Sequence, residues 1–128
     1  MNLPILYVAG LMTGYAEQNY PAFNAAADLL REHGYTVLNP VDSERLNPTP
    51  GQPQSWDWYM RHALKMVLEA EAVALLPDWQ DSRGATLEVH VARSLGMQVA
   101  PYKLWVDQAT LGCRYCGEPG GDCSYPCA

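Results

Sequence analysis

The residues best placed to do chemistry follow a short apolar run at residues 72–76. A polar turn with Ser82, Arg83 and Gly84 comes next, and Glu88 follows where the pattern predicts the first turns of a helix. In an open α/β sheet, ligands bind in the crevice beyond the carboxyl ends of the strands. A carboxylate beside the anion-binding N-terminus of a helix favours chemistry on a sugar phosphate. Most helix glutamates face solvent, however, and from the residues alone this simpler interpretation of Glu88 stays open.

Strand and helix signals alternate along the chain. Strands are predicted over residues 3–9, 35–38, 72–76 and 98–104. Helices are predicted over residues 21–33, 56–70 and from 84 or 85 to 95. Residues 41–55 carry three prolines and no apolar period, which predicts a long loop. Because helices connect successive strands, the pattern predicts a parallel sheet with right-handed crossovers.

Composition narrows the classes of partner. The chain has 128 residues, a formal charge of −6 and only eight basic residues. A nucleic-acid polymer is therefore not an expected partner, because binding its backbone needs clustered Lys and Arg, whereas a single nucleotide stays open. No apolar run approaches the ~20 residues of a membrane span. The N-terminus has no charged segment typical of a signal peptide, so a cytoplasmic location without membrane contact is expected.

The first strand and its turn supply further candidates. Tyr7 lies near the end of that strand, either as core packing or with its hydroxyl holding Glu88. The loop that follows is bracketed by glycines and meets the same sheet edge, so it either contacts a ligand or only turns the chain. Its candidate binding residues are Gly10, Met12, Thr13 and Gly14.

The polar turn and the second helix also have two interpretations. Ser82 is either a plain helix cap or a hydroxyl donor to a phosphate, with Arg83 and Gly84 beside it. Asp78 and Asp81 are either turn formers only, or one of them orients a ribose hydroxyl or serves as a second carboxylate. His62, Trp56 and Trp58 belong to the predicted second helix or its approach, where aromatic residues usually serve packing; the alternative is that one of them stacks on a base.

Four cysteines gather at the C-terminus, at Cys113, Cys116, Cys123 and Cys127. Four thiolates at such spacing can close a tetrahedral zinc site, and a closed site would be structural rather than catalytic. The pairs are closer together than in ordinary zinc ribbons, so a flexible or disulfide-linked tail is the alternative. The chain thus divides into an α/β domain over residues 1–104 and a Cys-rich tail over residues 105–128.

Three stretches resemble a known family: YVAGLMTG at 7–14, YPAFNAAADLLREHGYTVLNP at 20–40, and WDWYMRHALKMVLEAEAVALLPDWQDSRGATLEVHVARSLGM at 56–97. This is a domain of unknown function frequent in phages and bacteria. It is related to nucleoside 2-deoxyribosyltransferases and deoxynucleoside 5′-monophosphate N-glycosidases. The resemblance implies a flavodoxin- or Rossmann-like three-layer fold with a parallel sheet of four or five strands. It also implies a homodimer or higher homo-oligomer and no cofactor for catalysis.

The resemblance assigns roles to individual residues. Glu88 would attack C1′ of the sugar, Tyr7 would position it, and the loop from Gly10 would lie against the sugar or phosphate. Ser82 stands where the transferases have Asp and the monophosphate hydrolases have Ser, which favours a nucleotide over a nucleoside. Ala63 departs from the pattern, because relatives carry there an Asp that helps the base to leave.

Without that Asp, the proton for the base would come from His62, Asp57 or Asp78, or activity is weak or lost. The expected function is cleavage or transfer of the N-glycosidic bond of a (deoxy)nucleoside 5′-monophosphate. The alternative is a non-catalytic module that binds a nucleotide or nucleotide sugar, with a zinc-stabilised tail for interactions. An interaction protein whose α/β domain is only a scaffold is a further alternative.

Overall fold

The computed structural model describes residues 3–12, 19–49, 51–52 and 54–111, without the side chains of 109–111. Its parallel strands are β1 (Ile5–Ala9), β2 (Thr36–Leu38), β3 (Ala72–Leu75) and β4 (Gln98–Pro101). Its α-helices are α1 (Tyr20–Glu32), α2 (Trp56–Glu69), α3 (Arg83–Ser94) and α4 (Tyr102–Leu111), and two short 3₁₀ helices are η2 (Pro40–Leu46) and η3 (Trp79–Asp81).

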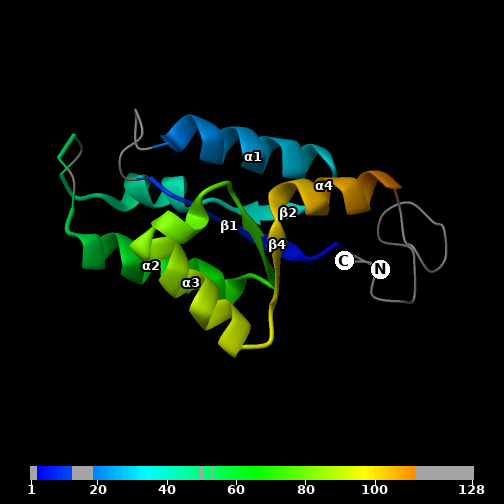
Figure 1. Ribbon diagram of the computed structural model, residues 1–128. Coiled ribbons are helices and arrows are strands. Elements are labelled where there is room, and N and C mark those ends of the chain that lie inside the picture. Colours follow the sequence, from blue (N-terminus) through cyan, green and yellow to red (C-terminus); the bar gives the residue numbers. More distant parts are fainter. Residues whose placement is uncertain (1–2, 13–18, 50, 53, 112–128) are drawn as a thin grey trace.

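These elements form three layers. The strands lie in the order β2-β1-β3-β4, with α1 and α4 on one face of the sheet and α2 and α3 on the other (Figure 1). The predicted α/β class and parallel sheet are thereby confirmed.

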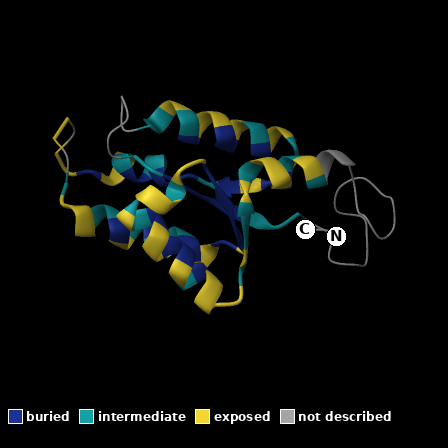
Figure 2. Cartoon of the chain, in the orientation of Figure 1, coloured by how far each residue is buried: buried dark blue, intermediate teal, exposed yellow. Residues whose placement is uncertain are grey.

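Alternation along the central strand places side chains in both cores. Leu6 and Val8 pack with α1 and α4, whereas Tyr7 and Ala9 pack with α2 and α3. Successive side chains of a strand point to opposite faces, so a strand covered on both faces is apolar throughout. Figure 2 accordingly shows the sheet interior as buried and the outer helix faces as exposed.

Two predicted segments differ from the structure. The prediction of a strand over residues 98–104 is wrong after Pro101, where the chain turns into α4. Proline lacks the N–H that a strand ladder needs and tolerates the start of a helix. The prediction of a long loop over 41–55 is wrong at its beginning, because η2 occupies Pro40–Leu46, with the Asn39 side chain accepting a hydrogen bond from Val41 N.

The helix α4 belongs to the core of the domain. Trp105 is 1% exposed, its indole Nε1 donates to the Val73 carbonyl at 3.0 Å, and its own carbonyl accepts from the Tyr35 hydroxyl at 2.7 Å. The predicted domain boundary after residue 104 therefore falls inside a helix that the sheet needs for cover.

The predicted cysteine ligands all lie outside the described residues, so the zinc site stays a prediction, as does the homo-oligomer. Within the described ranges, no group of three or more His, Cys, Asp or Glu side chains is placed to hold a metal ion. No helix in the described part of the chain is long and apolar enough to cross a membrane.

The substitution Trp105→Ala is expected to lower the free energy of unfolding by about 3–5 kcal/mol, because it opens a cavity and removes the indole hydrogen bond to the Val73 carbonyl. Urea unfolding measures this loss. The matched control is Leu104→Ala, whose side chain is 49% exposed and should cost less than about 1 kcal/mol. Equal losses for the two variants would contradict the packing of α4 on the sheet.

Candidate functional site

The site lies where the strand order reverses direction. From β1 the chain crosses to β2 on one side, while β3 pairs with β1 on the other. Ligands of doubly wound sheets bind at such a switch point, beyond the carboxyl ends of the strands. Gly10 follows β1 at this edge, and a Cβ there would lie 2.8 Å from the Leu76 Cβ, so only glycine fits without displacement.

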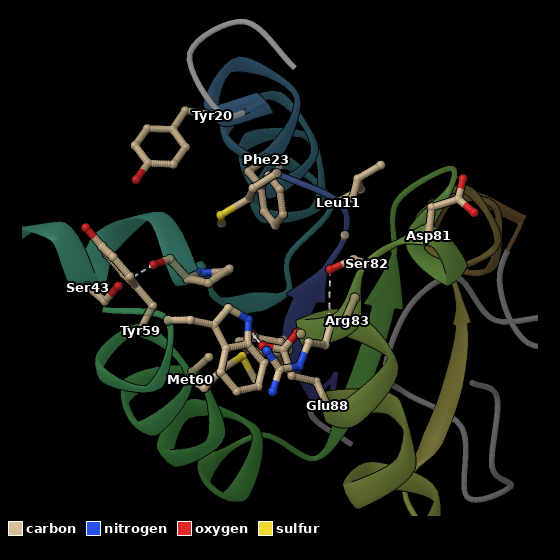
Figure 3. Close-up of a pocket in the computed structure, with 18 residues that line it drawn as sticks. Leu11, Tyr20, Phe23, Ser43, Tyr59, Met60, Asp81, Ser82, Arg83 and Glu88 are labelled. Atoms are coloured by element: carbon tan, nitrogen blue, oxygen red, sulfur yellow. Dashed lines mark hydrogen bonds between the residues drawn. The ribbon is translucent and has the colours of Figure 1, made fainter. Parts of the chain in front are cut away.

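A cavity of about 420 Å³ opens at this edge. Its size is within the range of small-molecule sites. Residues from all three layers line it (Figure 3): Tyr7, Gly10, Leu11, Met12, Tyr20, Phe23, Pro40, Ser43, Trp56, Tyr59, Met60, Ala63, Asp81, Ser82, Arg83, Gly84, Ala85 and Glu88.

A buried hydrogen bond forms the floor of the cavity. The Tyr7 hydroxyl donates to Glu88 Oε2 at 2.6 Å, and the two side chains are 0% and 5% exposed. Tyr7 comes from the central strand and Glu88 from the inner face of α3, beside Ala85 and Val89. A buried carboxylate without such a donor is costly, so this bond holds the group in one position.

The environment of Tyr7 and Glu88 raises the pKa of both side chains. Burial raises the pKa of Glu88 to about 7, although the hydrogen bond from Tyr7 lowers it. Burial, and then the charge of Glu88, raise the pKa of Tyr7 well above its ordinary value. Tyr7 therefore stays a donor near neutral pH, whereas Glu88 is poised between its protonated and ionised forms. Strongly shifted carboxylates in clefts are typical of functional sites.

The N-terminus of α3 forms one wall. The Ser82 hydroxyl caps the helix by accepting from Ala85 N at 3.0 Å, which leaves its proton available to a ligand. The Arg83 guanidinium lies 3.8 Å from the centre of the Trp56 ring, at the start of α2. Gly84 lets α2 approach, since a Cβ there would lie 2.9 Å from the Met60 sulfur. The first N–H groups of the helix and the guanidinium make this wall suited to an anion.

The opposite wall carries hydroxyl groups. The buried Ser43 donates to the Pro40 carbonyl at 2.8 Å, and Tyr59 donates to Glu44 Oε2 at 3.0 Å. Figure 3 shows Ser43 and Tyr59 on one side of the cavity and Ser82 on the other, with Glu88 below and between them. The cavity thus offers a carboxylate at its floor between two polar walls of different character.

Most of the candidates predicted from the sequence that the structure describes meet in this cavity: Tyr7, Gly10, Met12, Ser82, Arg83, Gly84 and Glu88. Thr13 and Gly14 lie outside the described residues.

None of the three predicted proton donors lines the cavity. Asp57 lies in the first turn of α2, where its Oδ2 is 4.0 Å from Arg61 Nε. His62 packs against the Trp58 ring with centroids 4.3 Å apart, one helix position away from the cavity-lining Ala63. Asp78, at φ 64°, turns the chain into η3 and borders a smaller hollow between the ends of β3 and β4.

Three polar residues of the cavity are not among the candidates predicted from the sequence. Tyr20 begins α1, Ser43 sits in η2 and Tyr59 lies on α2, so only the tertiary fold brings them together. No motif spans such distant segments. The one local signal is the position of Ser43 three residues after Pro40, a spacing at which a serine hydroxyl can bond back to the chain.

The fold and the site define a doubly wound α/β protein with a buried carboxylate in the ligand crevice of its sheet. The chain belongs to the family described as Domain of unknown function (DUF4406), whose model matches residues 4–101. The resemblance noted in the sequence is thereby confirmed.

Among solved structures, the chain is similar to a 2-deoxyribosyltransferase from the psychrotolerant bacterium Bacillus psychrosaccharolyticus, described as a biocatalyst for the synthesis of nucleosides. The match has a TM-score of 0.57 and 21% sequence identity, and covers 74% of this chain and 69% of the other. At this identity the likeness establishes the fold. No curated protein matches the chain.

The raised pKa of Glu88 makes stability depend on pH. The folded protein keeps the Glu88 proton up to a pKa of about 7, whereas the ordinary value is 4.5. The stabilisation is therefore complete below pH 4.5 and is lost as pH rises through about 7. Between pH 5 and pH 8, the wild type should lose about 2–3 kcal/mol of unfolding free energy relative to Glu88→Gln.

Urea unfolding of both proteins at the two pH values measures this difference. The exposed Glu69→Gln is the matched control and should follow the wild type. A wild-type curve parallel to that of Glu88→Gln would mean that the carboxylate is not held in a desolvated site.

Proposed function

We propose that this protein cleaves, or transfers across, the N-glycosidic bond of a (deoxy)nucleoside 5′-monophosphate, with Glu88 as the nucleophile. The observation that carries the proposal is the Tyr7–Glu88 hydrogen bond at the floor of a cavity at the switch point of the sheet. A fixed, ionisable carboxylate facing a cavity of nucleotide size is what covalent glycosyl transfer requires. The fold it shares with a 2-deoxyribosyltransferase supports the same assignment.

In the proposed first step, the ionised Glu88 attacks C1′ of the sugar while the bond from C1′ to the base breaks. The electron pair of that bond leaves with the base, which takes a proton from solvent water. The product is a glycosyl ester on Glu88, and water or a second base then attacks C1′ and restores the carboxylate. Tyr7 is a positioning residue in this scheme, since its hydroxyl fixes one carboxylate oxygen and leaves the other for attack.

The wall at the start of α3 would receive the 5′-phosphate. The Ser82 proton, the Arg83 guanidinium and the first helical N–H groups all donate to an anion. The ring of Trp56 holds the guanidinium by a cation–π contact at 3.8 Å. A phosphate bound there would leave the sugar over Glu88.

A second candidate is a nucleotide-binding module without catalysis, and Ala63 favours it. Ala63 lines the cavity and carries no acid that could help the base to leave. Among the described lining residues, Asp81 is the one besides Glu88 that carries a carboxyl group, and it points away from Glu88 in Figure 3. A melting shift with nucleotides but no base release would identify this second function.

Chromatography of deoxynucleoside and ribonucleoside 5′-monophosphates after incubation tests the first candidate. Wild-type protein should release free base, and Glu88→Ala should reduce the rate by about a thousandfold or more. Because the nucleophile must be ionised, kcat/KM should rise with pH and level off above about 7. Tyr7→Phe should move that rise to higher pH, because the Tyr7 hydrogen bond lowers the pKa of Glu88 and its removal raises that pKa.

His62→Ala is the matched control, because His62 packs on Trp58 and does not line the cavity; its rate should stay within about threefold of wild type. A rate that falls as pH rises through 7 would contradict the role of Glu88 as the nucleophile and would indicate that it acts as a general acid.

The substitution Ser82→Asp tests the phosphate wall. An aspartate keeps the helix cap but places a negative charge where the phosphate would lie. The kcat/KM for monophosphates should fall by about tenfold or more, while that for the corresponding nucleosides should be unchanged or higher. Ser82→Asn, which caps without charge, is the control, and an equal loss on both substrate types would contradict the assignment.

A further inference from the structure

The two walls of the cavity differ in the direction of their hydrogen bonds. At the α3 wall the ligand meets donors. At the wall formed by η2 and α2, the protons of both hydroxyls are already committed, Ser43 to the Pro40 carbonyl and Tyr59 to Glu44. A hydroxyl that has donated its proton can only accept from a ligand. Ser43 therefore presents lone pairs to the cavity, and Tyr59 presents the acceptor capacity that remains beside the hydrogen bond it takes from Gln54 N at 3.2 Å.

The surroundings keep these two hydroxyls in that state. Ser43 is 5% exposed, so water cannot easily take over its bond to Pro40. Glu44 Oε1 also accepts from Asn47 Nδ2 at 2.6 Å, which fixes the carboxylate behind Tyr59. The charge of Glu44 makes this wall electron-rich and favours a ligand edge that carries N–H groups.

Tyr20 adds a donor beside the two acceptors. Its hydroxyl has no hydrogen-bond partner among the described residues, and Figure 3 shows it above Tyr59 on the same side of the cavity. Burial, and then the nearby Glu44 carboxylate, raise the pKa of Tyr20, so the hydroxyl keeps its proton. The wall thus presents acceptors at Ser43 and Tyr59 with a donor beside them.

Phe23 and Met60 also line the cavity and add apolar surface of the kind that a flat base ring can pack against. With the sugar over Glu88 and the phosphate at α3, the base is directed toward Ser43 and Tyr59.

We infer that the wall of Ser43, Tyr59 and Tyr20 selects bases with an amidine edge, an inference that rests on the proposed function. An amidine edge is an amino group beside an unprotonated ring nitrogen. Adenine and cytosine carry this edge. Hypoxanthine and uracil carry the reverse arrangement, a carbonyl beside a ring N–H. Bound in the same orientation, they would set a carbonyl oxygen against the lone pairs of Ser43. Nearly isosteric pairs of this kind are separated strongly only when site and ligand must match donor to acceptor.

The experiment compares dAMP with dIMP and dCMP with dUMP, each pair differing at this edge. Base release by the wild type should favour dAMP and dCMP by about tenfold or more in kcat/KM. The same four nucleotides are titrated against Glu88→Gln by thermal shift, so the preference is also measured as binding, without turnover.

Two variants and one control test whether this wall causes the preference for dAMP and dCMP. Ser43→Ala and Tyr59→Phe each remove an acceptor and should bring both ratios toward one. Ser94→Ala is matched to Ser43→Ala, because Ser94 also bonds back to a carbonyl, His90 O at 2.7 Å, but on an exposed part of α3 outside the cavity. It should keep the wild-type ratios. A urea unfolding curve for each variant checks that it is folded. If Ser43→Ala does not fold, the ratios of Tyr59→Phe alone test the base preference.

The outcomes separate this inference from the proposed function. Equal turnover of all four nucleotides, a preference for dIMP and dUMP, or ratios unchanged in both variants would overturn the base selection and leave the N-glycosidase intact. Absence of base release together with a binding preference for dAMP and dCMP would overturn the glycosidase and support the selective wall. Absence of both release and binding would overturn both.

Discussion

The hydrogen bond from Tyr7 to Glu88 is the interaction on which the arrangement of this protein depends. It joins the central strand to α3 across 81 positions of sequence, inside the core between the sheet and the helices α2 and α3. A carboxylate that is 5% exposed needs a donor, and the hydroxyl of a fully buried tyrosine is the donor available. The bond is therefore possible only if β1, β3 and α3 hold their relative positions within a few tenths of an ångström.

Close packing supplies that precision. Gly10 allows the chain after β1 to touch Leu76 after β3, and Gly84 allows α3 to approach Met60 on α2. Trp105 then fixes the other face of the sheet by bonding to the carbonyl of Val73 in β3. The site is thus built on rigid strands and helices, while its two walls come from the start of α3 and from η2 with α2. A ligand would meet a donor wall, an acceptor wall and a titratable carboxylate between them.

The sequence was informative wherever chemistry follows from neighbours along the chain. The strand, polar turn and helix around Ser82 and Glu88 are contiguous, and the resemblance to a family added Tyr7 from a distant strand. Residues 98–104 misled because a β-rich run continues past Pro101, and the signal of that proline was weaker than the run. The role of Trp105 could not be predicted, since its partners Val73 and Tyr35 lie on other elements.

Two other limits are geometric. His62 and Ala63 differ by one position on α2, about 100° around the helix, and only packing decides which of them faces the cavity. Tyr20, Ser43 and Tyr59 come from three segments with no shared motif, so their convergence needs the folded chain. The wall that we infer to select the base was for this reason invisible in the sequence.

The most direct test of the central claim is to look for the glycosyl ester on Glu88. The protein is mixed with the nucleotide that it cleaves fastest, quenched in acid within the first turnovers and analysed by intact-mass and peptide mass spectrometry. A covalent step at Glu88 predicts one sugar-phosphate adduct, on the peptide that contains Glu88 and absent from Glu88→Gln. Base release without any adduct, or an adduct on another residue, would contradict it.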